Sequence, residues 1–165
     1  MNSVAQLADP TLILFAKLVL AALLGAVIGT ERAVIARQAA GTRTFALVSL
    51  GACLFIVTAL QVDSFYLGIV NFDPMRVAAA VITGIGFIGA GLIIFRGDTV
   101  HGTTTAAGLW IAAGVGTAVG FGMYSVAIFS TVLVLLIFSL MWYFENKFKH
   151  WFVDHEEGGA PPASQ

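Results

Sequence analysis

The most constraining feature of the sequence is a stretch of forty residues without a charged side chain, from Thr105 to Phe144. As a single α-helix it would be about 60 Å long, since each residue adds about 1.5 Å. The hydrocarbon core of a bilayer is only about 30 Å thick, so this stretch must fold back on itself. The Gly-Phe-Gly segment at residues 120–122 is the best turn, which predicts apolar helices near residues 105–119 and 123–144.

Three shorter apolar stretches precede it, near residues 12–28, 45–60 and 77–95. The first contains Lys17, and a lysine at a helix centre costs about 2.5–3.5 kcal/mol of insertion free energy. The eleven Leu, Ile, Phe and Val residues of this stretch return about 3–7 kcal/mol, at about 0.3–0.6 each. Lys17 can also extend its ammonium group toward the nearer interface. We therefore expect the stretch to insert into a bilayer.

The composition agrees with this pattern, because 59% of the residues are apolar and only 10% are charged. Soluble domains carry about 25% charged residues. A bilayer accepts an excess of apolar side chains that a soluble surface could not cover. The sequence therefore predicts an all-α integral membrane protein, a bundle of about five transmembrane helices. We assign residues 1–146 to this membrane domain and 147–165 to a short polar tail, whose end (158–165) we expect to be disordered.

The positive residues outside the predicted spans are distributed unevenly. With five spans, the 30–44 loop, the 96–104 loop and the tail lie on one side, and the other side holds only Arg76. Cytoplasmic loops carry an excess of Lys and Arg, so six positive residues against one predict a periplasmic N-terminus and a cytoplasmic tail. The six are Arg32, Arg37, Arg43, Arg96, Lys147 and Lys149.

Small residues recur at short intervals in the predicted spans. Residues 84–89 read Gly-x-Gly-x-x-Gly, but they lie inside an apolar span with no strand before them, which argues against a dinucleotide-binding loop. Small residues let helix backbones approach closely, and we expect such contacts within or between subunits. A functional unwound segment at residues 84–91 is the alternative there. The expected packing positions are Gly25, Gly29, Gly84, Gly86, Gly89, Gly91, Gly108, Ala112, Gly116 and Gly120.

Two polar segments precede predicted helices. Asp73 can cap the helix that begins at Pro74. The alternative is that Asp63 and Asp73 attract a hard cation such as Mg²⁺, which prefers oxygen ligands. Residues 103–105 are three threonines, which we interpret first as a cap for the following helix. Their hydroxyl groups could also line a polar pocket, so the identity of any metal or ligand stays open.

Charged residues bracket the loop between the first two spans, with Glu31 and Arg32 before it and Arg43 and Thr44 after it. Positive-inside charge explains the arginines but does not require Glu31. A carboxylate at a low-dielectric interface needs a cationic partner, which Arg32, Arg37 or Arg43 can supply. We hypothesise that Glu31, Arg32, Arg43 and Thr44 form a polar cluster at the cytoplasmic mouth of the bundle. The full set of polar candidates is Glu31, Arg32, Arg43, Thr44, Asp73, Arg76, Thr104 and Thr105.

The sequence contains no nucleophile and base at a spacing that indicates catalysis, and no cluster of His and Cys residues. The histidines His101, His150 and His155 are scattered, and the single cysteine, Cys53, lies in an apolar run and is interpreted as a small buried side chain. The net charge of −1 gives no indication of a nucleic-acid partner. We therefore expect a protein that is not an enzyme, needs no cofactor and has the lipid bilayer as its first partner.

Three segments, in order and spacing, resemble signatures of the MgtC/SapB family. Residues 24–32 (LGAVIGTER) and 40–52 (AGTRTFALVSLGA) resemble the first signature. Residues 76–91, which end in GIGFIGAG, resemble the second, and residues 101–110 (HGTTTAAGLW) resemble the third. The resemblance covers roughly residues 12–145.

The resemblance implies a protein of the bacterial inner membrane. The best-known members of the family support growth under magnesium limitation and have been linked to restraint of the ATP synthase rather than to magnesium transport. They also carry a soluble C-terminal domain, whereas only a short tail follows Phe144 here. We expect a non-enzymatic regulator in magnesium or ion homeostasis that acts through membrane partners, with the ATP synthase as a candidate. We also expect a homo-oligomer, with a dimer favoured. The alternative is a small oligomeric transporter or channel.

Overall fold

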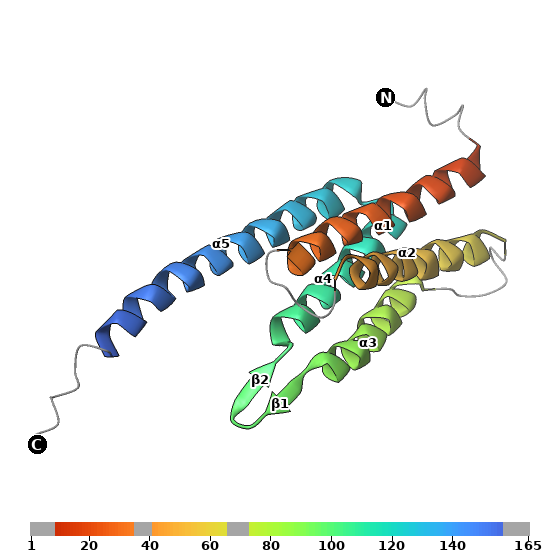
Figure 1. The fold of residues 1–165 in the computed structure, drawn as a ribbon. Helices are drawn as coiled ribbons and strands as arrows, with labels where there is room; N and C mark the ends of the chain where they lie inside the picture. The colour runs from red at the N-terminus through yellow and green to blue at the C-terminus, as the bar shows by residue number, and fades with distance from the viewer. Residues whose placement is uncertain (1–8, 35–40, 66–72, 157–165) are drawn as a thin grey trace, which may run out of the picture.

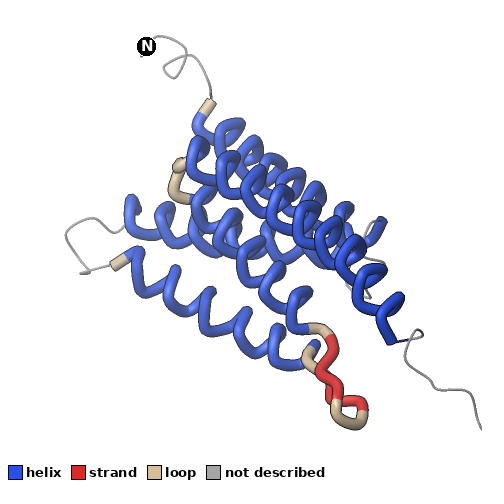
Figure 2. Tube along the Cα trace, turned by 90° about the vertical axis from the view of Figure 1, so that its left-hand side faces the viewer, coloured by secondary structure: helices blue, strands red, loops and turns tan. Residues whose placement is uncertain are grey.

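The computed structural model describes residues 9–34, 41–65 and 73–156, which form five helices and one short β-hairpin. The elements are α1 (Pro10–Val34), α2 (Thr42–Phe65), α3 (Pro74–Leu92), β1 (Ile94–Arg96), β2 (Thr99–His101), α4 (Thr103–Gly120) and α5 (Tyr124–Glu156). Figures 1 and 2 show the helices side by side, with successive helices running in opposite directions. The predicted all-α membrane bundle is therefore confirmed.

The helix α4 occupies the centre of the bundle. It contacts α1, α2, α3 and α5, and ten of its 18 residues are buried. In the described part of the chain, α1, α2, α3 and α5 are the helices long and apolar enough to cross a membrane. At about 27 Å, α4 is also close to the length of a span. It is rich in Ala, Gly and Thr because other helices surround it, and small residues favour such contacts.

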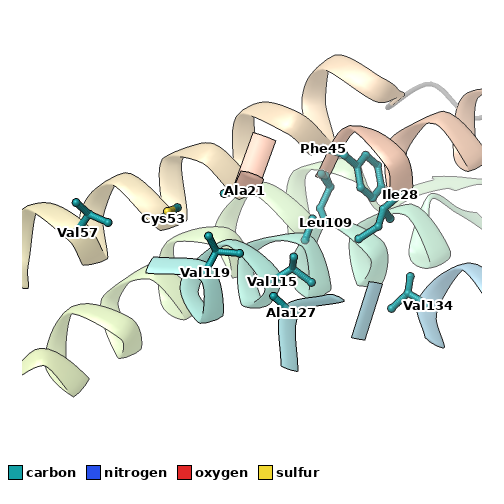
Figure 3. Packing of buried hydrophobic residues seen from close by; sticks show 11 residues of the cluster. Ala21, Ile28, Phe45, Cys53, Val57, Leu109, Val115, Val119, Ala127 and Val134 are labelled. Carbon is teal, nitrogen blue, oxygen red and sulfur yellow. The ribbon is translucent and has the colours of Figure 1, made fainter. Parts of the chain in front are cut away.

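Glycines bring the backbones of the central helices together. Gly116 of α4 lies directly against the backbone carbonyl of Ser49 in α2, and Gly25 of α1 lies against the same turns of α2. A Cβ at Gly120 would lie 2.8 Å from a side chain of α2, at Ile56. Larger apolar side chains fill the space around these contacts, as Figure 3 shows. Among them are Ile28, Phe45, Leu109, Val115 and Val119. The junction of α1, α2 and α4 is therefore closed by direct helix packing.

Lys17, the charged residue of the first span, has a defined partner inside the bundle. Its Nζ atom donates a hydrogen bond of 3.0 Å to the carbonyl oxygen of Gly120. Gly120 is the last residue of α4, where carbonyl groups lack partners within the helix and carry partial negative charge. The ammonium group therefore caps α4, which offsets part of the cost of placing a lysine in an apolar helix.

Two local predictions are confirmed. Gly122 closes the turn between α4 and α5 with a φ of 79°, and its N–H donates to Val119 over 2.9 Å. Glycine adopts such a φ without steric cost, which explains why the uncharged stretch folds back there. At the start of α3, the carboxylate of Asp73 accepts a hydrogen bond of 3.0 Å from the N–H of Met75, so Asp73 is an N-cap.

The third span ends earlier than predicted. The helix α3 stops at Leu92 instead of residue 95, and Ile94–Arg96 pairs antiparallel with Thr99–His101. Gly97, with a φ of 59°, allows the tight turn of this hairpin. The suggestion of an unwound segment at residues 84–91 is wrong, because α3 is continuous through them.

Other boundaries also differ from the prediction, since α1 and α2 continue to Val34 and Phe65. The N-cap of α4 is Gly102, with a φ of 88° and no side-chain cap, so the threonines at 103–105 belong to the helix itself. The helix α5 continues to Glu156, and at about 50 Å it extends beyond the rest of the bundle (Figure 1). The first part of the polar tail is thus helical. Residues 158–165, for which the sequence predicts disorder, lie outside the described residues.

Candidate functional site

A groove of about 680 Å³ lies between α2 and α3. We call it the α2–α3 groove. Its walls carry exposed apolar side chains, and Ala113 of α4 lies among the residues that line it. The groove stays open because Gly51 and Gly84, which face it, have no neighbouring atoms where a Cβ would lie. Its lining residues are Arg43, Thr44, Leu47, Val48, Gly51, Ala52, Phe55, Val77, Ala80, Val81, Gly84, Ile85, Ile88 and Ala113.

The polar end of the groove is formed by the first turn of α2. Arg43 and Thr44 are exposed there. Among the residues that line the groove, Arg43 carries the charge and Thr44 carries the hydroxyl group. The position of this turn is fixed by a hydrogen bond of 3.1 Å between the hydroxyl groups of Thr30, near the end of α1, and Thr42. The site therefore combines an apolar channel with one guanidinium group at its mouth.

Glu31 and Arg32 lie near this mouth in sequence but are buried, with exposed fractions of 8% and 5%. The guanidinium carbon of Arg32 stacks 4.5 Å from the ring centre of Phe138 in α5. Both carboxylate oxygens of Glu31 are buried without a hydrogen-bond partner. Of the three arginines expected as partners of Glu31, Arg43 therefore forms no hydrogen bond with it. Arg32, the neighbour of Glu31 in sequence, still interacts with Glu31 electrostatically. Arg37 lies outside the described residues.

The remaining polar candidates do not join the groove. Asp73 and Arg76 begin α3, at the end of the groove opposite Arg43, and Asp73 is used as a cap. Thr104 is exposed, whereas Thr105 is buried at 4% exposure in α4. Within the described ranges, no group of three or more His, Cys, Asp and Glu residues could hold a metal ion.

The predicted packing positions fall into two groups. Six of the glycines lie against another helix or the turn before one, where a Cβ would meet atoms within 4 Å, and Ala112 is fully buried. These six are Gly25, Gly29, Gly89, Gly108, Gly116 and Gly120. Gly84, Gly86 and Gly91 have open space instead, so no helix in the described part of the chain packs against them. Whether they pack against a second copy stays a prediction.

Reasoning from the sequence does not find the α2–α3 groove. It assigns Gly84 to helix packing, while Gly51 and the wall residues Leu47, Phe55 and Ile88 carry no signal of their own. Apolar side chains that line a groove are indistinguishable in sequence from those that face lipid. The usable signal is a small residue in each of two neighbouring spans, here Gly51 and Gly84, which can leave space between two helices.

Comparisons with known proteins agree with the fold and the signatures. The model of the MgtC family matches residues 18–147. The chain belongs to the MgtC family. Protein MgtC of Salmonella typhimurium is 42% identical over 118 residues, which are 72% of this chain and 48% of that protein. No solved structure matches the chain.

Other MgtC relatives show the same extent of similarity. The Escherichia coli K12 protein named "Putative magnesium transporter YhiD" is 42% identical over 123 residues, 73% of this chain and 57% of its own length. A Haemophilus influenzae protein is 41% identical over 129 residues, 76% of this chain and 54% of its own. The chain thus spans about half the length of these curated relatives.

Proposed function

We propose that this MgtC-family chain is a non-enzymatic membrane regulator of magnesium or ion homeostasis that acts through contacts with other membrane components. Its relatives include MgtC itself and a protein named for magnesium transport, and it is 42% identical to both over more than two thirds of its length. The observation that favours regulation over transport is the closed junction of α1, α2 and α4. There Gly25 and Gly116 bring helix backbones into direct contact and leave no room for a hydrated ion.

In this proposal the chain acts through its outer surfaces. The resemblance makes the ATP synthase a candidate partner for them. A homo-oligomer, with a dimer favoured, also fits, because Gly86 and Gly91 of α3 have open space that a second copy could occupy.

Transport of a cation is the second candidate, and one observation favours it. Glu31 places two carboxylate oxygens in a buried position without a hydrogen-bond partner. Carboxylate oxygens are ligands that magnesium prefers, and buried oxygen atoms without a hydrogen bond are costly. In this alternative, a cation would be coordinated by Glu31 on its path through the bundle.

We expect Arg43→Lys to impair growth under magnesium limitation at wild-type protein levels in a strain that lacks its own copy of the gene. Lysine keeps the charge but cannot supply the planar fork of arginine. The matched control is Arg96→Lys, an exposed arginine of the hairpin.

We also expect proteoliposomes that contain the wild type to take up magnesium no faster than empty ones. In nanodiscs, we expect light scattering to give the mass of two copies. Magnesium uptake that Glu31→Gln abolishes would establish the transporter instead.

For localisation, we propose the bacterial inner membrane with a periplasmic N-terminus and a cytoplasmic C-terminus. The end of α1, the start of α2, the hairpin and the C-terminal part of α5 lie at one end of the bundle (Figure 1). That end holds Arg32, Arg43, Arg96 and Lys147. Alkaline phosphatase fused after Phe152 is expected to be inactive, because it would remain in the cytoplasm. Activity comparable to that of a periplasmic control fusion contradicts this orientation.

A further inference from the structure

We propose that the α2–α3 groove binds an anionic phospholipid, with an acyl chain along the groove and the phosphate held by Arg43 and Thr44. The proposal concerns the ligand of this groove and is independent of whether the protein regulates or transports. It rests on the shape of the groove, on its length and on the position of its one charged residue.

The groove is apolar along most of its lining, as a binding site for an alkyl chain would be. Its lining includes the small residues Gly51, Ala52 and Gly84 and the large apolar side chains Leu47 and Phe55, which have 66% and 61% of their surface exposed. Apolar side chains left exposed in a bilayer meet lipid tails as their solvent. A furrow of about 680 Å³ between two spans therefore receives a tail more readily than a hydrated solute.

The length of the groove matches one leaflet of the membrane. Along α2 it runs from Thr44 to Phe55, which at about 1.5 Å per residue is about 16 Å. Half of a hydrocarbon core of about 30 Å is about 15 Å. A lipid tail whose headgroup lies at Thr44 would thus end near Phe55, opposite Val77 at the start of α3.

The charge at the mouth selects the headgroup. Arg43 is exposed in the first turn of α2, and no carboxylate in the described part of the chain pairs with its guanidinium group. A guanidinium group binds phosphate through two parallel hydrogen bonds, and the hydroxyl group of Thr44 can donate a third. Basic residues beside spans attract anionic lipids. The net negative headgroup of phosphatidylglycerol fits this end better than the zwitterionic headgroup of phosphatidylethanolamine.

The test is native mass spectrometry of the full chain released from detergent after incubation with equimolar phosphatidylglycerol and phosphatidylethanolamine. We expect the wild type to retain phosphatidylglycerol preferentially, and Arg43→Gln to reduce that preference about tenfold, as for the loss of one charge-assisted contact. Gly84→Leu, which places a side chain in the groove, should reduce retention of both lipids. Its matched control is Gly86→Leu, since Gly86 also has open space in α3 but does not line the groove.

Several results would overturn the proposal. Equal retention of the two lipids by the wild type would show that Arg43 does not select the headgroup. An unchanged preference in Arg43→Gln would show the same. Equal effects of Gly84→Leu and Gly86→Leu remove the groove as the binding place. Displacement of the lipid by millimolar inorganic phosphate assigns the site to a free anion. A Gly84→Leu variant that keeps its lipids but loses its dimer mass assigns the groove to a second copy. Circular dichroism confirms that each variant remains helical.

Discussion

Replacing Gly116 with leucine is expected to prevent the bundle from assembling. A side chain at this position would collide with the backbone carbonyl of Ser49, and backbone cannot move aside as a flexible side chain can. Ordinary overpacking of a core costs about 1–3 kcal/mol, and a clash with the backbone of a neighbouring helix should exceed that range. We expect loss of monodisperse protein in size-exclusion chromatography of detergent extracts, together with a lower apparent Tm for any protein recovered.

Gly114→Leu is the matched control for this substitution. Gly114 lies two residues away in the same helix, but no atoms lie within 4 Å of the place that a Cβ would take, because Gly114 faces a second groove, of about 530 Å³, between α4 and α5. Glycine is less favourable than alanine in helices by about 0.8–1 kcal/mol, and leucine ranks just below alanine, so this variant should be as stable as the wild type or more stable. If both leucine variants assemble equally well, the contact between Gly116 and Ser49 is not what holds α4 in place.

The second large effect is expected at Gly102, where the hairpin joins α4. Gly102 has a φ of 88°, and a Cβ there would collide with the backbone carbonyl of Leu92 at the end of α3. Its own carbonyl accepts the hydrogen bond of 2.9 Å from Ala106 at the start of α4. Gly102→Ala should therefore separate the end of α3 from the start of α4 and lower the free energy of unfolding by several kcal/mol.

Gly97→Ala serves as a control that has the backbone strain of Gly102→Ala but not its clash with Leu92. Gly97 also has a positive φ, of 59°, but nothing lies within 4 Å of the place that a Cβ would take. Alanine in the left-handed region costs about 1–2 kcal/mol at either position. The difference between the two variants, measured by chemical denaturation in detergent micelles, reports the contact with Leu92. A similar loss of stability in Gly97→Ala and Gly102→Ala would show that only the strain matters.

Functional residues are harder to predict than helices, and Arg43 illustrates the reason. The sequence places Arg43 at the membrane interface, and the family signature makes it a candidate. Glu31, for which the sequence allows a pairing with Arg43, is instead buried without a hydrogen-bond partner. Arg32 stacks on Phe138, more than one hundred positions later in the chain. Which partner a charged side chain meets depends on how helices pack, and no local pattern encodes that choice.

The sequence by itself determined the membrane class, the helical stretches, the fold-back at Gly122 and the cap at Asp73. These follow from properties local to a segment, namely apolar length against the thickness of a bilayer, a glycine where φ is positive, and a carboxylate before a proline. Only the tertiary structure decided that α4 is central, that Gly116 packs within the chain while Gly84 opens a groove, and that Lys17 caps α4. Each of these depends on contacts between segments far apart in sequence, and identical glycines differ only by the helix that lies opposite them.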